Sequence, residues 1–427
     1  MDEELIFSHQ KFDWDNYSRY EDHEFDKFRD RAKAFFKTQG LNFSEDIIYI
    51  LFGELISRYS FGKYLGIRGR ENLNWTITNR FLVEEFTPIN FDLLLLGGFH
   101  RHPEFESAFL KYLPSKVRVS KAVSSRKKIS LKLGAVASRL GKWGLDNYPL
   151  PVKKRILYVL ANKKLILNTK IAFDIIGSSH GIYDDCGALM LALCRLSSGR
   201  IYIIQSGFIH LQAKYIYQVK YELGICDRYL GWGGGVNSEK IINLGCMYSW
   251  RSKKVEKKRG ALIILPQVPS VIPRAFSYYW CCYSDFEADL VRLIRRTVEL
   301  KEKYGSVQLR CKSVDKEFYS ELFSKVDLSL SIDPGDINMG EHFDAYEWTH
   351  IFYFSTAIAE AFYKGSSVQI EFMRSSFLLD DRYKGVTDFF GDNHTNQDDL
   401  EDYLKSFAIQ TNPDVYAKSL TELLLLQ

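Results

Sequence analysis

The chain has 427 residues, of which 46% are apolar and 15% aromatic, and its formal net charge is +4. This length exceeds what one hydrophobic core usually supports, so we expect two domains, and the apolar content excludes extensive disorder. The small positive charge does not point to nucleic acid, and no pattern of a nucleic-acid-binding module occurs in the sequence. The longest apolar runs, such as IIYILFG and LLLLGGF, fall well short of the roughly 20 residues that span a bilayer.

Two features predict a cytoplasmic protein. The first ten residues, MDEELIFSHQ, are acidic and lack the basic-then-apolar pattern of a signal peptide. The seven cysteines form no CxxC pair and no Cys/His ligand spacing. We therefore interpret them as reduced core thiols, and we expect neither a metal nor a tightly bound cofactor.

The first third of the chain is predicted to contain a helical region. Residues 44–66 carry apolar side chains at helical spacing behind a Ser44 cap. The segment INFDLLLLGGF (89–99) then predicts a short buried strand that ends in glycines. Residues 116–142 include nine lysines and arginines and no acidic residue. We interpret this basic segment either as a solvated loop or helix face, or as a surface that docks on an anionic membrane.

After residue 149, short β-rich segments alternate with helical ones, which predicts βαβ units and parallel sheets covered on both faces. The charged stretch KKVEKKRG (253–260) interrupts this series and is our candidate linker. It divides the chain into an N-terminal domain (1–250), which includes the helical region and the basic segment, and a C-terminal domain (251–427). We expect the last helices to pack back on the N-terminal domain. Strands are predicted in 170–178, 200–207, 228–233, 240–245, 260–267, 306–313, 326–333 and 366–372, and helices in 183–198, 285–305 and 354–365.

The first candidate site lies in FDIIGSSHGIYDDCGALML (173–191), where a strand turns into a helix. Ligands of doubly wound folds bind at such corners, beside the free N–H groups of the helix. Asp184 and Asp185 are candidate catalytic carboxylates, and one of them is equally well explained as the helix N-cap. His180 is a further catalytic candidate, with a structural hydrogen-bonded histidine as the alternative.

Three more corners are candidates for binding the substrate. Gln205, Ser206 and Gly207 follow the next strand, where the glycine allows close backbone approach, although an ordinary strand-end turn gives the same pattern. Arg310 and Lys312 end a later strand, where two cations suit a diphosphate and a solvated face is the alternative.

The third of these corners has the most specific spacing. Ser355 and Thr356 follow an aromatic strand and open a helix, and Glu360 lies one turn further on. Hydroxyls and free N–H groups at a helix start suit a phosphate, and a glutamate one turn in can bind a ribose diol. A capping box would place the glutamate closer to the cap, so we favour the functional interpretation.

The order of these motifs resembles a family of bacterial transferases of surface-polysaccharide biosynthesis. The matching motifs run SSHxxYDD, QxG, DRYLxWG, NLG, IILP, LRxK and FSTxxxExxxxG, over roughly residues 45 to 375. The family has the GT-B glycosyltransferase architecture and is similar to capsule and lipopolysaccharide Kdo transferases, which use a CMP-activated sugar. Such families commonly carry QHG where this chain has Gln205-Ser206-Gly207. The departure implies that the role of that histidine has moved, with His180 and His210 as candidates, or that activity is altered.

The resemblance implies a GT-B-like α/β fold, with two Rossmann-like domains facing a central cleft, and a metal-independent glycosyltransferase. The C-terminal domain would hold a nucleotide-sugar donor through Ser355, Thr356 and Glu360, with Arg310 or Lys312 offsetting its charge. A carboxylate from the 180–185 corner would act on the acceptor.

The best sugar candidate is Kdo or a related acidic sugar, and the acceptor a cell-surface glycan or its lipid-linked precursor. Peripheral attachment through residues 116–142 would place the protein on the inner face of the bacterial inner membrane. The alternatives are a CDP-alcohol phosphotransferase of the teichoic-acid type and a catalytically inactive GT-B-like scaffold.

Overall fold

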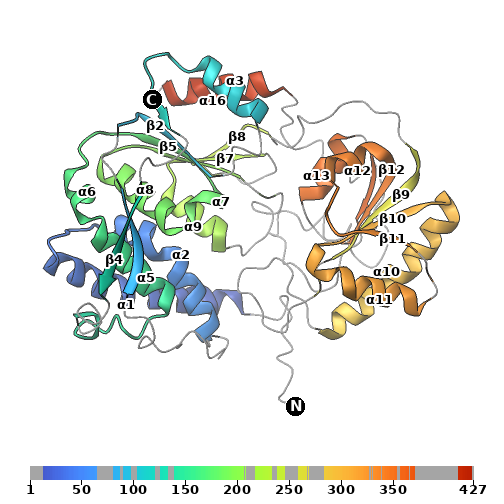
Figure 1. The fold of residues 1–427 in the computed structure, drawn as a ribbon, viewed down its shortest axis with the longest axis horizontal. Coiled ribbons are helices and arrows are strands. Elements are labelled where there is room, and N and C mark those ends of the chain that lie inside the picture. The colour runs from blue at the N-terminus through green and yellow to red at the C-terminus, as the bar shows by residue number, and fades with distance from the viewer. Residues whose placement is uncertain are drawn as a thin grey trace.

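A computed structural model of the protein provides the coordinates. It describes residues 13–64, 80–86, 90–97, 103–120, 126–132, 139–205, 207, 217–232, 238–245, 258–266, 268, 283–326, 328, 330–337, 339–352, 356–364, 366–370 and 412–425. Its strands form two separate parallel sheets, which Figure 1 shows in different lobes, and a two-stranded antiparallel ribbon.

The first sheet has six parallel strands in the order β3-β2-β5-β6-β7-β8. Its strands are short and mostly buried because helices cover both faces. The strands are β2 (Leu93–Leu96), β3 (Val119–Ser120), β5 (Asp174–Ser178), β6 (Ile201–Ile204), β7 (Arg228–Gly231) and β8 (Ile241–Asn243).

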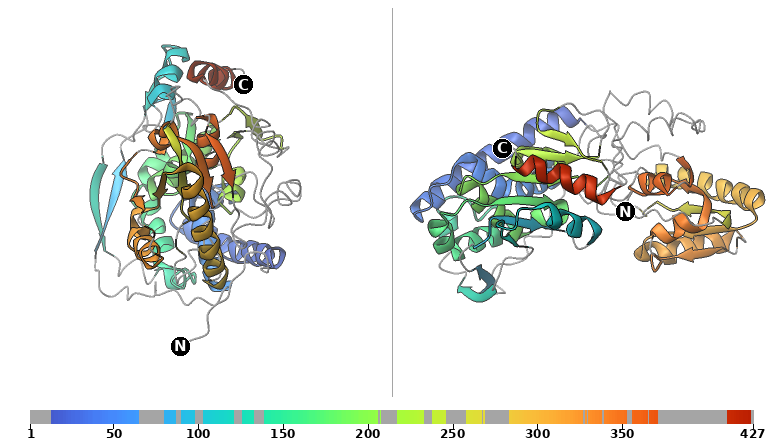
Figure 2. Two further views of the ribbon diagram at one scale, coloured as in Figure 1. Left: turned by 90° about the vertical axis from the view of Figure 1, so that its right-hand side faces the viewer. Right: turned by 90° about the horizontal axis from the view of Figure 1, so that it is seen from above.

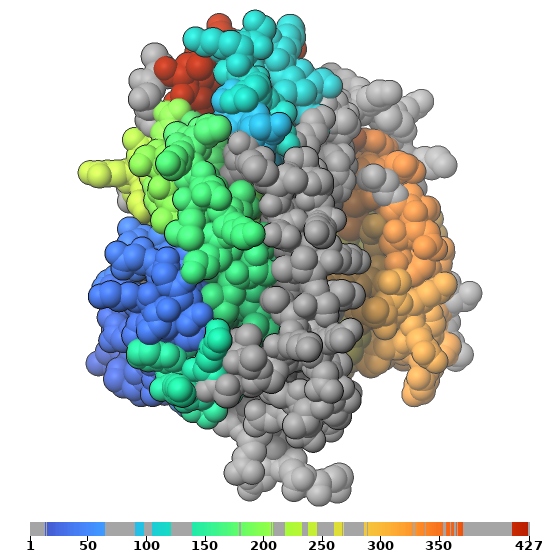
Figure 3. All heavy atoms as spheres, turned by 60° about the vertical axis from the view of Figure 1, so that its left-hand side comes forward, coloured from blue at the N-terminus to red at the C-terminus, as the bar shows by residue number. Residues whose placement is uncertain are grey.

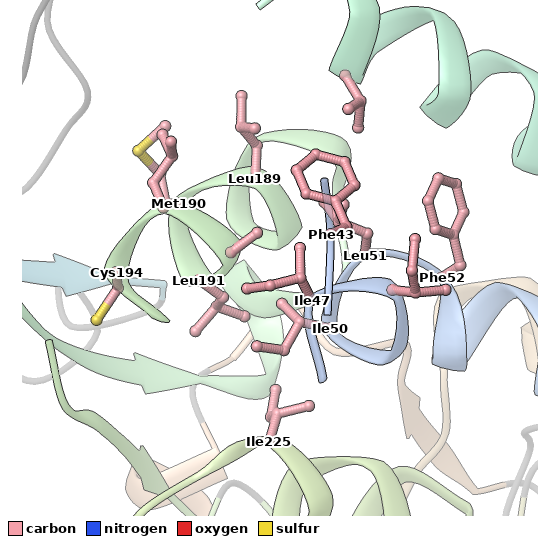
Figure 4. Packing of buried hydrophobic residues seen from close by; sticks show 14 of the residues in the cluster. Phe43, Ile47, Ile50, Leu51, Phe52, Leu189, Met190, Leu191, Cys194 and Ile225 are labelled. Carbon is pink, nitrogen blue, oxygen red and sulfur yellow. The ribbon is translucent and has the colours of Figure 1, made fainter. Parts of the chain in front are cut away.

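Alternate residues of these strands enter two different hydrophobic cores. Leu94 and Ile175 belong to the larger core, together with residues of seven helices, among them α6 and the short α7 (Ser179–Ile182). Figure 4 shows part of this core, where Phe43 and Ile47 approach Leu189. The helices of this face are α1 (Trp14–Thr38), α2 (Glu45–Tyr64), α5 (Leu150–Ala161), α8 (Asp185–Leu196) and α9 (Tyr217–Ile225), with α6 (Lys163–Asn168) alongside.

The opposite face of the first sheet carries a helix pair from distant parts of the sequence. Leu93 and Leu95 pack there against α3 (Pro103–Tyr112) and the C-terminal α16 (Pro413–Leu425). Figure 3 shows α3 and α16 side by side, and the right-hand view of Figure 2 shows α16 lying along this lobe. The last helix of the chain therefore contributes to the core of the first sheet.

The second sheet has five parallel strands in the order β11-β10-β9-β12-β13. Helices α10 and α11 pack on one face, and α12 and α13 pack beside β9, β12 and β13. The elements are β9 (Lys258–Ile264), α10 (Tyr283–Tyr304), β10 (Val307–Arg310), a 3-10 turn (Ser313–Asp315), α11 (Lys316–Lys325), β11 (Ser331–Asp333), α12 (Met339–Ala345), β12 (Tyr346–Ile351), α13 (Thr356–Tyr363) and β13 (Ser367–Ile370).

The predicted α/β class with two Rossmann-like parallel sheets is thus confirmed. The first sheet ends at Asn243 and the second begins at Lys258, whereas the division of the chain after residue 250 stays a prediction. Residues 253–257 of the candidate linker lie outside the described residues, and the last three residues of that stretch begin β9.

The basic segment differs from its prediction. Instead of a loop or a helix face, residues 126–132 form strand β4 (Arg126–Lys132), which pairs with β1 (Arg80–Phe86) in the antiparallel ribbon beside α5. Its register places Glu84 opposite Lys128 and Glu85 opposite Lys127. No helix among the described residues has the length and hydropathy needed to cross a membrane.

Candidate functional site

The first sheet has its topological switch point between β2 and β5. The chain proceeds from β2 to β3 on one side, and from β5 to β6, β7 and β8 on the other. Leu96 pairs with Gly177 at the carboxyl ends of these two strands. Ligands of open parallel sheets bind outside the carboxyl ends of the strands at such a point. The SSHGIYDD corner follows β5 directly, so it lies where this rule predicts a site.

Glycines allow the backbones to meet at this switch point. Gly97, directly after β2, has a φ of 108°, which disfavours other residues. A Cβ atom at Gly181 would lie 2.5 Å from the Cα atom of Gly97. The short helix α7 (Ser179–Ile182) therefore packs against the end of β2 with no room for a side chain.

The two aspartates of the corner have different environments. Asp184 is the N-cap of α8, because its Oδ1 accepts a hydrogen bond of 2.5 Å from the Gly187 amide. Asp185 is the first residue of the helix, and its Oδ1 accepts from Nε of Arg155 at 2.5 Å. The Asp185 side chain is 40% exposed. Capping thus explains one aspartate, as the sequence allowed, and leaves the second for another role.

Backbone placement is all that the structure describes for the catalytic candidate His180. It lies in α7, between Gly177 and the capped start of α8, and therefore at the same sheet edge. The alternative candidate His210 lies outside the described residues.

Gln205 is buried and cross-links two strand ends. Its Nε2 donates to the carbonyl oxygen of Gly207 at 2.8 Å, and its Oε1 accepts from the Trp232 amide at 2.9 Å. The carboxamide thus ties the turn after β6 to the end of β7. Ser206 lies outside the described residues. Ser178 of β5 is paired with Ile204 of β6, so this turn adjoins the SSHGIYDD corner.

The second sheet has its switch point between β9 and β12. The chain runs outwards from β9 to β10 and β11, and then returns to β12 and β13 on the other side. Ile264 pairs with Ile351 at the carboxyl ends of these strands. Helix α13 begins at Thr356, five residues after this pair, so its N-terminus follows the strand end at which a ligand is expected.

Within this corner, Ser355 lies outside the described residues, whereas Thr356 and Glu360 lie on α13 and are half-buried. Glu360 is one turn after Thr356 and therefore on the same side of the helix. The described part of this corner thus has a helix N-terminus, a hydroxyl and a carboxylate, and their role in binding stays a prediction.

Arg310 and Lys312 differ in their surroundings. The Arg310 guanidinium donates to the Asp333 carboxylate and to the carbonyl oxygen of Ile337. The Asp333 carboxylate also contacts Nε2 of the buried His342 at 2.7 Å. Although burial opposes it, the hydrogen bond with His342 and those from backbone amides hold the pKa of Asp333 below its ordinary value. Arg310 is thus part of a local ionic cluster, whereas Lys312 is exposed.

A buried polar network behind the SSHGIYDD corner was not predicted. Arg155 donates to Asp185 and also to the carbonyl oxygen of Tyr183 at 2.8 Å. The Tyr183 hydroxyl donates to Glu222 at 2.5 Å, and the Tyr229 hydroxyl donates to the other carboxylate oxygen at 3.0 Å. Burial raises the pKa of Glu222 to about 7, although the hydrogen bonds from Tyr183 and Tyr229 act in the opposite direction and lower it.

The sequence contains one indication of this network, namely a charged residue within an apolar helix. Glu54, in the apolar run of α2, is buried near Arg155 and Arg58, and burial raises its pKa. Among the described residues, no group of three or more histidines, cysteines or acidic side chains is arranged to hold a metal ion.

Comparison with known proteins gives a distant structural likeness. No protein-family model matches the chain, and no curated protein matches it in sequence. Among solved structures, it is similar to a point mutant of S. aureus TarM in complex with fondaparinux, alpha-GlcNAc-glycerol and UDP, with 12% identity and a TM-score of 0.32. The match covers 63% of this chain and 53% of TarM, so the chain spans about half the length of that protein.

Proposed function

We propose that the protein is a glycosyltransferase of GT-B architecture, which transfers a sugar from a nucleotide-activated donor to an acceptor. One observation carries this proposal: each of the two parallel sheets has a switch point, and a motif suited to the chemistry follows each one. The SSHGIYDD corner follows β5 in the first sheet, and the FST corner follows β12 in the second. Each of the two parallel sheets therefore offers one site of the kind at which such sheets bind ligands. Two such sites suit a reaction between two substrates.

The donor nucleotide belongs at the second sheet in this proposal. The N-terminus of α13 offers free N–H groups and a positive dipole end to the donor phosphates, with Ser355 and Thr356 as hydroxyl donors. Glu360, one turn on, would bind the ribose. The guanidinium of Arg310 is held by Asp333, and Lys312, which is exposed two residues further on, is a second candidate for offsetting phosphate charge. Leaving-group stabilisation of this kind requires no metal.

The acceptor and the catalytic carboxylate belong at the first sheet. Glycosyl transfer passes through a transition state that resembles an oxocarbenium ion. A carboxylate can remove the proton of the acceptor hydroxyl, which inverts the anomeric centre, or attack the sugar, which retains it. Asp185 suits either role better than Asp184, whose Oδ1 caps the helix. His180 and the turn at Gln205, Ser206 and Gly207 would line the same edge.

The finer assignment follows the family resemblance. A CMP-activated donor, Kdo or a related acidic sugar as the transferred group, and a surface glycan or its lipid-linked precursor as acceptor form our first hypothesis. It is supported by the order of the motifs and by the positions of the described ones at the two switch points. The departure at Gln205-Ser206-Gly207 adds a reason to measure activity directly.

A thermal-shift screen with CMP, CDP, UDP and GDP tests the donor assignment. A nucleotide at about 100 times its dissociation constant stabilises the folded protein by about 2.7 kcal/mol, which raises the melting temperature measurably. We expect CMP to give the largest shift. CDP as the preferred ligand, with CDP-glycerol turned over, would instead identify a phosphotransferase. No shift with any of the four would contradict nucleotide-dependent transfer.

The substitution Thr356→Asp locates the donor site. A carboxylate in the first turn interacts favourably with the positive end of the helix dipole. The variant is therefore expected to fold at least as stably as the wild type. The same charge repels phosphate, so the thermal shift with nucleotide should disappear. An unchanged nucleotide shift in this stable variant would contradict binding at α13. Thr356→Ser, which keeps the hydroxyl, is the matched control and should retain the shift.

We further propose that the basic ribbon attaches the protein to anionic membranes. Glu84 and Glu85 face Lys128 and Lys127 across the ribbon, so part of the positive charge is balanced, and Arg126 and Lys132 add to what remains. Each lysine or arginine near an anionic surface contributes about 1 kcal/mol of attraction. Flotation with phosphatidylglycerol vesicles is expected to recover the protein at low salt. Recovery that persists after charge reversal of Arg126, Lys127 and Lys128 together would contradict this attachment.

A further inference from the structure

Arg155 is a buried cation whose donors are divided among three acceptors, one on α2 and two on the SSHGIYDD corner. Its side chain, on α5, is 4% exposed. Besides Asp185, it donates to the carbonyl oxygens of Leu51 at 3.0 Å and of Tyr183 at 2.8 Å. A lysine has one nitrogen and cannot reach three acceptors in different directions, whereas the guanidinium has a fixed fork of donors. An arginine therefore fits this site better than a lysine.

The corner beside Arg155 is fixed a second time through its tyrosine. The Tyr183 hydroxyl donates to Glu222, which is fully buried on α9, and Tyr229 of β7 donates to the other carboxylate oxygen. Residues 183–185 are thus held from α5 through their backbone and carboxylate, and from α9 and β7 through the ring. This double attachment determines where the Asp185 carboxylate lies.

Charged groups near Arg155 come from three helices. They are Glu54 and Arg58 from α2, Asp185 from α8, and Glu222 from α9. Burying a guanidinium is costly unless its charge is balanced and its donors are used. The balancing carboxylate of Asp185 is not buried in return. Its Oδ1 meets Arg155, and within the described part of the chain its Oδ2 has no hydrogen-bond partner.

The same helix has a second arginine–aspartate pair, in which both carboxylate oxygens of the aspartate accept hydrogen bonds. Its arginine is Arg195, at the other end of α8. It donates to Asp227 at 2.9 Å and to the carbonyl oxygen of Ile225 at 2.9 Å, with both side chains partly exposed. Asp227 uses its second oxygen on the Ile201 amide. The second oxygen of Asp185, by contrast, accepts a hydrogen bond from no described residue.

We infer that Arg155 is the positioning residue of the transfer site. It holds Asp185 in one orientation, with Oδ1 engaged and Oδ2 presented to the acceptor hydroxyl or the sugar. This inference rests on the proposed function and adds a residue to it that lies on neither corner. Misplacing a reacting group by about 1 Å slows a reaction by about a hundredfold, so loss of the guanidinium should reduce turnover rather than donor binding.

The test is a double-mutant cycle on kcat for nucleotide release. The probes are CMP-Kdo, UDP-N-acetylglucosamine and GDP-mannose, with the one that the wild type turns over used throughout. Arg155→Met is expected to lower kcat by about tenfold to a hundredfold and to leave the KM for the donor unchanged, because the donor site lies on the other sheet. Arg155→Lys should recover part of kcat, since an ammonium can still meet Asp185.

Coupling distinguishes positioning from general support of the fold. In the Asp185→Asn background, Arg155→Met should cause little further loss, because both changes remove the same oriented carboxylate. Arg195→Met is the matched control. It removes an arginine–aspartate pair from the same helix and should lower stability while leaving the kcat of folded protein unchanged. If Arg155→Met does not fold, the same cycle is run with Arg155→Lys.

The outcomes separate this inference from the proposed function. Full kcat in a folded Arg155→Met protein, or losses that simply multiply with those of Asp185→Asn, would overturn the positioning role. If the wild type binds no nucleotide and releases none from any probe, the proposed function itself fails. Loss of kcat with unchanged KM and strong coupling to Asp185 supports both.

Discussion

The buried carboxyl group of Glu222 gives the protein a pH-dependent stability. Burial raises its folded-state pKa from the ordinary 4.5 to about 7. In the unfolded chain the group ionises at its ordinary value. Between these two values the folded protein retains a proton that the unfolded chain has lost, so stability falls as the pH rises. The loss of stability is absent at pH values below the unfolded-state pKa of 4.5 and complete at pH values above the folded-state pKa of about 7.

The substitution Glu222→Gln removes this effect and preserves the contacts. The difference between 4.5 and about 7, at about 1.36 kcal/mol per pH unit, corresponds to roughly 3 kcal/mol of stability, of which about 2.5 kcal/mol is lost between pH 5 and pH 8. A glutamine can accept from one of Tyr183 and Tyr229 and donate to the other, as a protonated carboxyl group does. We therefore expect the variant to be more stable than the wild type at pH 8 by roughly 3 kcal/mol.

Urea unfolding at the two pH values measures the effect, followed by circular dichroism and tryptophan fluorescence. The difference in unfolding free energy between Glu222→Gln and the wild type should grow by about 2.5 kcal/mol from pH 5 to pH 8. Glu239→Gln, at an exposed position between β7 and β8, is the control. Its unfolding free energy should match that of the wild type at both pH values. Parallel pH dependences of Glu222→Gln and the wild type would refute the assignment of a buried protonated carboxyl group.

Three further changes test the packing. Asp184→Ala removes the N-cap of α8 and should cost about 1 kcal/mol, whereas Asp184→Asn should cost little; equal losses would contradict capping. Gly181→Ala places a Cβ atom 2.5 Å from backbone and should destabilise by about 1–3 kcal/mol, while Gly62→Ala in α2 meets nothing within 4 Å and should stabilise slightly. Leu420→Ala leaves a cavity at a buried position of α16 and should cost about 2–5 kcal/mol, whereas Leu425→Ala at an exposed position should cost less than about 1 kcal/mol. Thermal melts measure both pairs. A Gly62→Ala protein less stable than Gly181→Ala, or a Leu425→Ala protein less stable than Leu420→Ala, would contradict the packing described.

Strands and helices after residue 149 could be predicted because each has a local pattern. The segment IYII is apolar throughout, as a strand buried on both faces must be, and it forms β6. The aspartate pair and the FST corner could be predicted because a strand that leads into a helix is visible in the sequence. Their positions at the switch points could not be predicted, since strand order depends on long-range pairing.

The ribbon and the buried network show what local patterns miss. Strand β4 contains three lysines, residues that are depleted in strands, and it is recognisable only from its pairing with β1. Arg155 and Glu222 lie in helices of unremarkable composition and are buried only because α2, α5 and α9 meet there. The partners lie 30 positions apart for Arg155 and Asp185, 39 for Tyr183 and Glu222, and 104 for Arg155 and Leu51. Such pairings are not visible in a short window of sequence.

Hydrogen–deuterium exchange with the nucleotide that gives the largest thermal shift tests the central claim most directly. That claim is a donor site at the carboxyl edge of the five-stranded sheet. We expect slower exchange in peptides that cover the ends of β9 and β12 and the first turn of α13. Protection confined to the six-stranded sheet, or no protection at all at saturating nucleotide, would contradict it.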